Sequence, residues 1–207
     1  MKLKVWWIVP LTLFLLSLSL GFAIVQGTRN TFFVPKPTLI PPDSDPTLGD
    51  PSAPVTIIEF SDFTCTYCQL FAQQRTRQRI LEQYPQTVRW IYRSFPAAHP
   101  EAEAAAEAAQ CAYEQDKFWS YQDALYQNQA RLAAPLYFEL AQTQGLNTDR
   151  FYRCMREGRY KAIALDASAA VRYNVRVLPT FVVNGEIIEG LATFEDLAAR
   201  INRLIKR

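Results

Sequence analysis

The sequence predicts an α/β protein whose central sheet is interrupted by a long helical insertion. Three observations support this prediction. Apolar, β-branched residues at 55–60 are followed by a helical pattern and then by a second strand pattern at 87–93. Helical patterns occupy most of residues 101–173, and the chain closes with a hairpin pattern and one more helix. A strand–helix–strand half and a hairpin–helix half can share one sheet, with the intervening helices as an insertion.

The first half of the sheet is predicted from two strands and the helix between them. Residues 55–60 have the pattern of a buried strand. The helix begins at Cys65 and runs to about residue 84, where Pro85 ends it. Residues 87–93 alternate in polarity and are rich in β-formers, which is typical of a second strand.

The insertion covers about residues 97–174 and is predicted to be helical. Residues 101–115 are rich in alanine, the strongest helix former. Residues 117–129 carry aromatic side chains at helical spacing, which favours core packing. Pro135 suits the first turn of a third helix and Asn147 the cap of a fourth. Residues 161–173 continue the helical pattern.

The last part of the chain carries two local signals. Asn184-Gly185 separates two β-rich runs at 179–183 and 186–189, and this dipeptide favours a type I′ hairpin turn. Thr193 and Asp196 have the spacing of a capping box. They open a final helix that runs to about residue 206.

The N-terminus has the pattern of an export or membrane segment. Lys2 and Lys4 precede an almost uncharged run at 5–25, which is about long enough to span a bilayer. We expect residues 1–27 to form an uncleaved anchor; the alternative is a signal peptide cleaved near residues 21–23. The two lysines would keep the N-terminus in the cytoplasm. The rest of the chain would then lie in the periplasm or an equivalent space, where disulfides persist.

A proline-rich segment connects this run to the domain. Residues 28–51 predict a stiff, extended tether, so the domain is expected at residues 52–207. The whole chain has 207 residues and a net charge of only +2. This charge gives no reason to expect a nucleic-acid partner.

The pair Cys65 and Cys68 lies where a strand pattern ends and a helix pattern begins. A helix N-terminus stabilises an anion, so Cys65 is expected to ionise readily and act as the nucleophile in disulfide exchange. Cys68 lies one turn later and can close a disulfide with it. Haem attachment would need a histidine at position 69, which is Gln69. Zinc would need further ligands, and His99 is the one histidine, so we expect a redox pair without metal or cofactor.

Two further polar residues and two further cysteines are open to more than one interpretation. Glu59 is either a solvent-facing acid on its strand or a buried carboxylate that relays a proton to or from Cys68. His99 either caps the first inserted helix at the surface or lies near the site. If Cys65 pairs with Cys68, then Cys111 and Cys154 can form a structural disulfide; otherwise they are two buried thiols.

Four segments together resemble the DsbA-like family of thiol–disulfide oxidoreductases over about residues 49–207. They are Glu59 to Cys68, Tyr92-Arg93-Ser94-Phe95-Pro96, the run from Cys111 to Trp119, and the run from Leu178 to Gly185. The resemblance implies a thioredoxin-like fold with an inserted helical subdomain. It also implies a cis peptide bond before Pro179 that faces the dithiol, although proline also suits a strand start for purely structural reasons.

The resemblance assigns roles to individual residues. Cys65 would exchange with a partner protein, Cys68 would resolve the mixed disulfide, and Glu59 would lie below the pair. Thr66, Tyr67 and Leu178 would contact the substrate. The best-known oxidases of the family carry Pro-His between the cysteines. Thr66 and Tyr67 supply only hydroxyl donors there, and therefore stabilise a thiolate less.

The function predicted from these observations is disulfide formation in exported proteins that are unfolded or partly folded. A quinone-linked membrane enzyme would reoxidise the pair, and the N-terminal segment would hold the protein at the membrane. A reductase or isomerase would use the same residues. A metal-binding carrier using the two cysteines, or a redox-inactive binding module, are alternatives of other classes.

Overall fold

The computed structural model describes residues 45–96 and 100–206. The expected anchor or signal peptide, most of the expected tether, and His99 lie outside these residues. Within them, no helix is long and apolar enough to cross a membrane.

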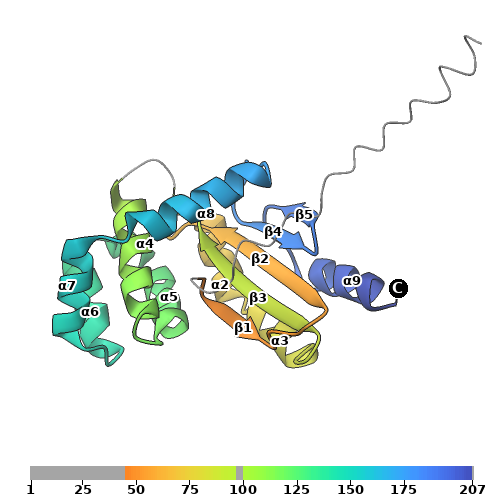
Figure 1. Cartoon of the computed structure of the whole chain (residues 1–207), viewed down its shortest axis with the longest axis horizontal. Helices are drawn as coiled ribbons and strands as arrows, with labels where there is room; N and C mark the ends of the chain where they lie inside the picture. The colour runs from red at the N-terminus through yellow and green to blue at the C-terminus, as the bar shows by residue number, and fades with distance from the viewer. Residues whose placement is uncertain (1–44, 97–99, 207) are drawn as a thin grey trace, which may run out of the picture. The chain divides into compact units, whose positions relative to one another are not determined.

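A mixed sheet forms the centre of the described part of the chain (Figure 1). Its strand order is β1-β3-β2-β4-β5, with β2 and β3 parallel and the other neighbouring pairs antiparallel. The strands are β1 (Thr47–Gly49), β2 (Val55–Ser61), β3 (Val88–Ser94), β4 (Thr180–Val183) and β5 (Glu186–Glu189). The strand predictions for 55–60, 87–93 and the hairpin therefore hold within a residue or two.

Helices cover both faces of this sheet and extend beyond it. They are α2 (Thr66–Gln73), α3 (Thr76–Gln83), α4 (Pro100–Tyr113), α5 (Phe118–Gln127), the short 3-10 helix η3 (Gln129–Arg131), α6 (Ala134–Thr143), α7 (Thr148–Glu157), α8 (Tyr160–Arg172) and α9 (Phe194–Ile205). The segment from α4 to α8 is the helical insertion. The thioredoxin-like fold with an inserted helical subdomain is thus confirmed.

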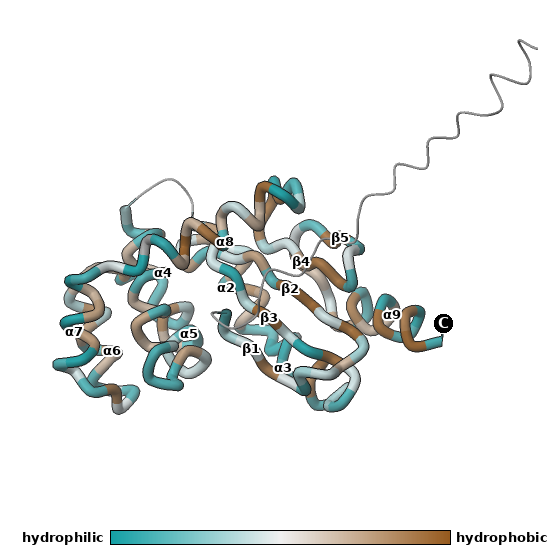
Figure 2. Tube along the Cα trace, in the orientation of Figure 1, coloured by the Kyte–Doolittle hydropathy of each residue, from teal (hydrophilic) through white to brown (hydrophobic). Residues whose placement is uncertain are grey.

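Successive side chains of β2 point to opposite faces of the sheet, and helices pack against both faces, so the strand is buried on each side. Ile57 packs among residues of α2, α3 and α9, whereas Ile58 packs against α8. Figure 2 shows the apolar residues of β2 as a brown stretch through the middle of the sheet. Near the end of β2, Phe63 belongs to the core of the insertion. The loop after β2 therefore lies where the sheet meets the insertion.

The helix expected from Cys65 to about residue 84 is instead broken in two. Arg75 lies between α2 and α3 with φ of 55°, in the left-handed region. A non-glycine residue adopts this conformation only at a cost, so surrounding packing must stabilise it. The break allows α3 to start with Thr76 and Arg77 buried. No proline or glycine marks the break, which is why the sequence pattern predicted one continuous helix.

The expected tether also ends earlier than predicted. Residues 47–49 form β1, which pairs antiparallel with the outer side of β3. Asp45 is buried and accepts a hydrogen bond from Arg93 Nε at 3.0 Å. Gly49 has φ of +87°, and a Cβ there would lie 2.2 Å from Val88 O. The folded domain thus begins before Ser52, because residues 47–49 pair with the edge of the sheet that β3 would otherwise form.

The local signals at chain turns are confirmed. Asn184 and Gly185 have φ of 45° and 91°, as a type I′ turn requires. Thr193 and Asp196 form a capping box in which the Asp196 N–H donates to Thr193 Oγ1 at 3.1 Å. Asn147 Oδ1 caps α7 by accepting from Arg150 N at 2.9 Å. Pro135 lies in the first turn of α6.

A disulfide joins Cys111 of α4 to Cys154 of α7, with the Cα atoms 5.7 Å apart. Both residues are buried in the core of the insertion. The bond therefore ties two of the inserted helices together.

Candidate active site

The first thiol of the candidate site, Cys65, lies at the N-cap of α2. Its Sγ accepts a hydrogen bond from Cys68 N at 3.3 Å. Cys65 is partly exposed, whereas Cys68 is fully buried one turn further along. Both are free thiols in this structure. A partner can therefore reach Cys65 but not Cys68.

The pKa values of the two thiols are shifted in opposite directions from their ordinary value. The hydrogen bond from the Cys68 thiol, helped by the backbone N–H groups of Cys68 and Tyr67, lowers the pKa of Cys65 to about 7 against the opposing effects of burial and Asp62. Burial first, and then the bond to Cys65, raises the pKa of Cys68 well above its ordinary range. At neutral pH Cys65 is therefore a nucleophilic thiolate for much of the time, while Cys68 keeps its proton.

Side chains from two elements hold the loop that carries Cys65. The Asp62 carboxylate accepts from Thr64 N at 2.7 Å and from Thr64 Oγ1 at 2.9 Å. Gln129 of η3 donates from Nε2 to Phe63 O at 2.7 Å and to Cys65 O at 3.0 Å. Asp62 precedes a turn, where aspartate is a recognised signal. Nothing in the sequence pointed to Gln129, which reaches the loop from the insertion.

The peptide bond between Leu178 and Pro179 is cis. Leu178 O lies 3.7 Å from Cys65 Sγ, so this segment faces the dithiol. Pro179 is buried and is followed directly by β4. The structure thus brings Leu178 next to a cysteine 113 residues earlier in the chain.

Apolar groups are exposed on the helix that begins at the dithiol and in the segment before Leu178. Tyr67 is 61% exposed and Leu70 is 37% exposed, both on α2. Val177 is 46% exposed. Thr66 is exposed as well. Tyr67, Leu70 and Val177 are therefore exposed apolar side chains on the two segments that flank Cys65.

Glu59 is buried, which excludes the interpretation of a solvent-facing acid. Only 1% of its surface is exposed, and its Oε2 accepts a hydrogen bond from Trp90 Nε1 at 2.9 Å. Arg77 Nη1 lies 3.7 Å from the same oxygen. Burial raises the pKa of Glu59 despite the opposing charge of Arg77. Sequence reasoning missed Arg77 because the break before α3 turns it inward.

Three buried hydroxyl groups lie beside Cys68 and Glu59. Tyr126 OH donates to Ser61 Oγ at 3.1 Å, and Tyr92 OH lies 3.3 Å from Tyr126 OH. Hydrogen bonding by the Ser61 hydroxyl lowers the pKa of Cys68 and also that of Glu59, in both cases against the larger effect of burial. The aromatic pattern of α5 indicated core packing alone and gave no sign of this role.

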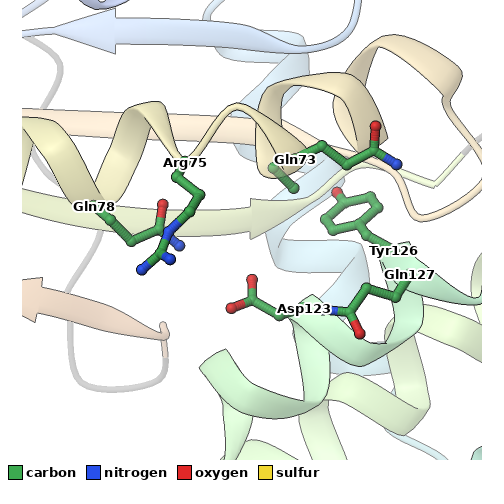
Figure 3. Close-up of a pocket in the computed structure, with 7 residues that line it drawn as sticks. Gln73, Arg75, Gln78, Asp123, Tyr126 and Gln127 are labelled. Carbon is green, nitrogen blue, oxygen red and sulfur yellow. The ribbon is translucent and has the colours of Figure 1, made fainter.

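A cleft of about 430 Å³ lies between α5 and the α2–α3 break (Figure 3). Arg75 and Gln78 face Asp123 and Gln127 across it, and Tyr126 forms part of its wall. Neither cysteine lines this cleft. Among residues 45–96 and 100–206, no group of three or more His, Cys, Asp or Glu side chains could hold a metal ion.

A family model described as Thioredoxin matches residues 42–203. The chain belongs to the thioredoxin family. The match covers the sheet, the helical insertion and the dithiol. The matched residues include all four segments that carry the resemblance to the DsbA-like family, and the fold and this match together support that resemblance.

Solved structures show the same architecture. BdbD from Bacillus subtilis, in the oxidised form, has a TM-score of 0.72 at 21% identity and covers 80% of this chain and 95% of its own. DsbA1 of the α type from Wolbachia pipientis has a TM-score of 0.71 at 22% identity, with 83% and 96% covered. A thioredoxin-like oxidoreductase from Silicibacter pomeroyi has 0.69 at 27% identity, with 79% and 94% covered.

Curated relatives of this chain are much longer proteins. The Na(+)/H(+) antiporter NhaA 3 of Salinispora tropica is 36% identical over 165 residues, which is 78% of this chain and 25% of that protein. NhaA 1 of Salinispora arenicola is 34% identical with the same coverage. The chain thus spans about a quarter of the length of the curated relatives that it matches.

Proposed function

We propose that this protein is a thiol–disulfide oxidoreductase that forms disulfide bonds in exported proteins. The observation that carries the exchange activity is the pair of opposite pKa shifts at Cys65 and Cys68, one turn apart, with Leu178 O 3.7 Å from Cys65 Sγ. An exposed thiol of low pKa and a buried thiol of high pKa are the two partners that disulfide exchange requires. The oxidising direction is proposed from the structural disulfide between Cys111 and Cys154, which fits an oxidising compartment.

The proposed reaction starts from the Cys65–Cys68 disulfide. A substrate thiolate attacks Cys65 Sγ, the disulfide breaks, and Cys68 leaves with the electron pair and takes up a proton. A second substrate thiolate then attacks the substrate sulfur of the mixed disulfide, and Cys65 leaves as a thiolate. The substrate loses two electrons and gains a disulfide, while the protein ends as a dithiol.

Glu59 is proposed as the acid that supplies the proton to Cys68. Its buried carboxyl has a raised pKa, so it carries a proton over a wider pH range than an exposed glutamate. The high pKa of Cys68 means that its thiolate would be a poor leaving group without such a donor. Arg77 would stabilise the carboxylate that remains.

Substrate is proposed to bind over Thr66, Tyr67 and Leu178. The backbone beside Pro179 can pair with an extended peptide, and Tyr67 offers an exposed aromatic contact. Unfolded or partly folded chains expose both features. The Cys111–Cys154 disulfide supports an oxidising compartment, such as the periplasm, and the N-terminal sequence supports attachment to its membrane. A quinone-linked membrane enzyme is the proposed reoxidant.

A reductase or isomerase is the second candidate, and the pKa of Cys65 favours it. That pKa is about 7. The corresponding cysteine has a pKa of about 7 in thioredoxin, a reductant, and about 3.5 in DsbA, a strong oxidant. Thr66 and Tyr67 bring no cation that would stabilise the thiolate further.

The direction of electron flow is tested with the full-length protein in its oxidised form. Incubation with a reduced, unfolded test protein should produce disulfides in that protein and leave Cys65 and Cys68 as thiols. The variant Cys68→Ser should instead accumulate mixed disulfides through Cys65. A redox potential near about −270 mV, that of thioredoxin, together with reduction of insulin and no oxidation of the test protein, would favour the reductase.

A further inference from the structure

A row of three buried, hydrogen-bonded hydroxyl groups runs from β3 through the insertion to the end of β2, beside the dithiol. Tyr92 comes from β3, Tyr126 from α5 and Ser61 from the end of β2. All three side chains are buried, with at most 2% of each exposed. Burial raises the pKa of both tyrosines well above the ordinary value, so both keep their protons and act as donors.

The order of donation along this row follows from counting hydrogens. Each hydroxyl has one hydrogen to donate. Tyr126 donates its hydrogen to Ser61 Oγ, so the contact at 3.3 Å between the tyrosines must be a donation from Tyr92 to Tyr126. Ser61 accepts from Tyr126, and its own hydrogen remains for another acceptor.

The Ser61 hydroxyl is within hydrogen-bonding reach of both Glu59 and Cys68. Glu59 lies two residues earlier on β2, and alternate residues of a strand share a face. Cys68 belongs to the same buried cluster as Tyr92 and Tyr126. Because one hydrogen serves one strong acceptor at a time, the serine must change partner when a charge moves between the carboxyl and the thiol.

We propose that the Ser61 hydroxyl relays a proton between Glu59 and Cys68, and that Tyr126 is the positioning residue that holds this hydroxyl in place. This inference rests on the proposed thiol–disulfide exchange. When Cys68 leaves the disulfide, Ser61 gives its proton to Cys68 Sγ and receives the proton of the Glu59 carboxyl in the same step. Cys68 ends as a thiol, Ser61 is unchanged and Glu59 becomes a carboxylate, which regains a proton from water.

The surroundings support both ends of this transfer. Arg77 Nη1 lies 3.7 Å from Glu59 Oε2 and stabilises the carboxylate after it gives up its proton. Gln69 Nε2 of α2 donates to Tyr126 O at 2.7 Å, which fixes α5 against the helix that carries Cys68. The inserted subdomain thereby contributes Tyr126 of α5 to the proposed proton transfer.

The test measures the rate at which glutathione reduces the oxidised full-length protein across a range of pH. Each rate is divided by the glutathione thiolate concentration, so that only the response of the protein remains. For the wild type this corrected rate should fall as pH rises through the raised pKa of Glu59, because the acid form supplies the proton. Ser61→Ala should lower the rate about tenfold at low pH and flatten the profile. Ser61→Thr, which keeps a hydroxyl, should keep the sloping profile.

Three companion variants separate a proton relay from general damage. Glu59→Gln with Ser61→Ala should be no slower than the slower single variant, because both act on one step. Tyr126→Phe should also lower the rate and flatten the profile. Tyr121→Phe is the matched control, since Tyr121 is a buried tyrosine of the same helix whose OH donates to Tyr137 O at 2.8 Å, away from Ser61. It should match the wild type.

A sloping, wild-type profile in Ser61→Ala would overturn the inference. If Ser61→Ala fails to fold, a wild-type profile in Tyr126→Phe would do so instead. If the wild type exchanges with glutathione but does not oxidise the test protein, the proposal of net substrate oxidation fails. The proton relay through Ser61 is still tested by comparing Ser61→Ala with the wild type. Absence of any exchange with glutathione would overturn both proposals.

Discussion

Removal of the Cys111–Cys154 disulfide should destabilise the protein by an amount that the loop length determines. The two cysteines are 43 residues apart. In the chain-entropy model a closed loop of this size restricts the unfolded state by about 4 kcal/mol at 25 °C. For a domain of this size that loss corresponds to a fall in melting temperature of about 8–16 °C.

The variant for this measurement replaces both cysteines by alanine. Both side chains are buried in an apolar core, so alanine avoids the buried hydroxyl groups that serine would introduce. Denaturant unfolding should be compared in a background in which Cys65 and Cys68 are also alanine, so that redox state at the active site does not contribute. Glutathione exchange should be measured separately with the active-site cysteines intact. It should continue, because Gln129 and Asp62 hold the active-site loop without this disulfide.

A loss of less than about 1 kcal/mol would refute the reasoning, because it would mean that the unfolded chain is not restricted as the model assumes. The same result would follow if the two thiols were never bonded in protein isolated without reductant. Peptide mass mapping of that protein distinguishes the two explanations.

Four further predictions concern the site and the domain boundary. In the reduced protein, Cys65 should be alkylated before Cys68 and should titrate near its pKa of about 7; labelling of Cys68 first would contradict the assigned roles. The pKa of Cys65 is lower in the folded protein than the unfolded value of about 8.5. Its contribution to the stability of the reduced form is therefore fully present above that value and lost as pH falls through about 7, which pH-dependent unfolding would reveal. Pro179→Thr should prolong mixed disulfides with substrates, seen as trapped complexes on non-reducing gels, and unchanged exchange kinetics with nothing trapped would remove Pro179 from the site. Gly49→Ala should cost more than about 1 kcal/mol of unfolding free energy, because φ is +87° and the new Cβ would lie 2.2 Å from Val88 O; unchanged stability would show that β1 is not part of the folded domain.

Local features of this protein were determined by the sequence alone. The β-branched run of β2, the Asn184-Gly185 turn and the capping box of α9 each depend on residues that are neighbours in the chain. The same holds for the position of Cys65 at a helix start and for its spacing from Cys68, because the Cys68 thiol and the backbone N–H groups of Cys68 and Tyr67 lower its pKa. Such features are predictable because the physical causes act within a few residues.

Only the tertiary structure decided which distant residues meet. The turn at Arg75, the pairing of β1 with β3, and the approach of Gln129 to Cys65 carry no local signal. Ser61 and Tyr126 are 65 residues apart in the chain. Nothing in the sequence around either residue indicates that their hydroxyl groups meet in the core. Burial of Glu59, which raises its pKa, likewise arises from side chains of β3 and α3 packed around it. The sequence therefore determined where the dithiol lies, and the packing of the insertion on the sheet determined which groups can serve it.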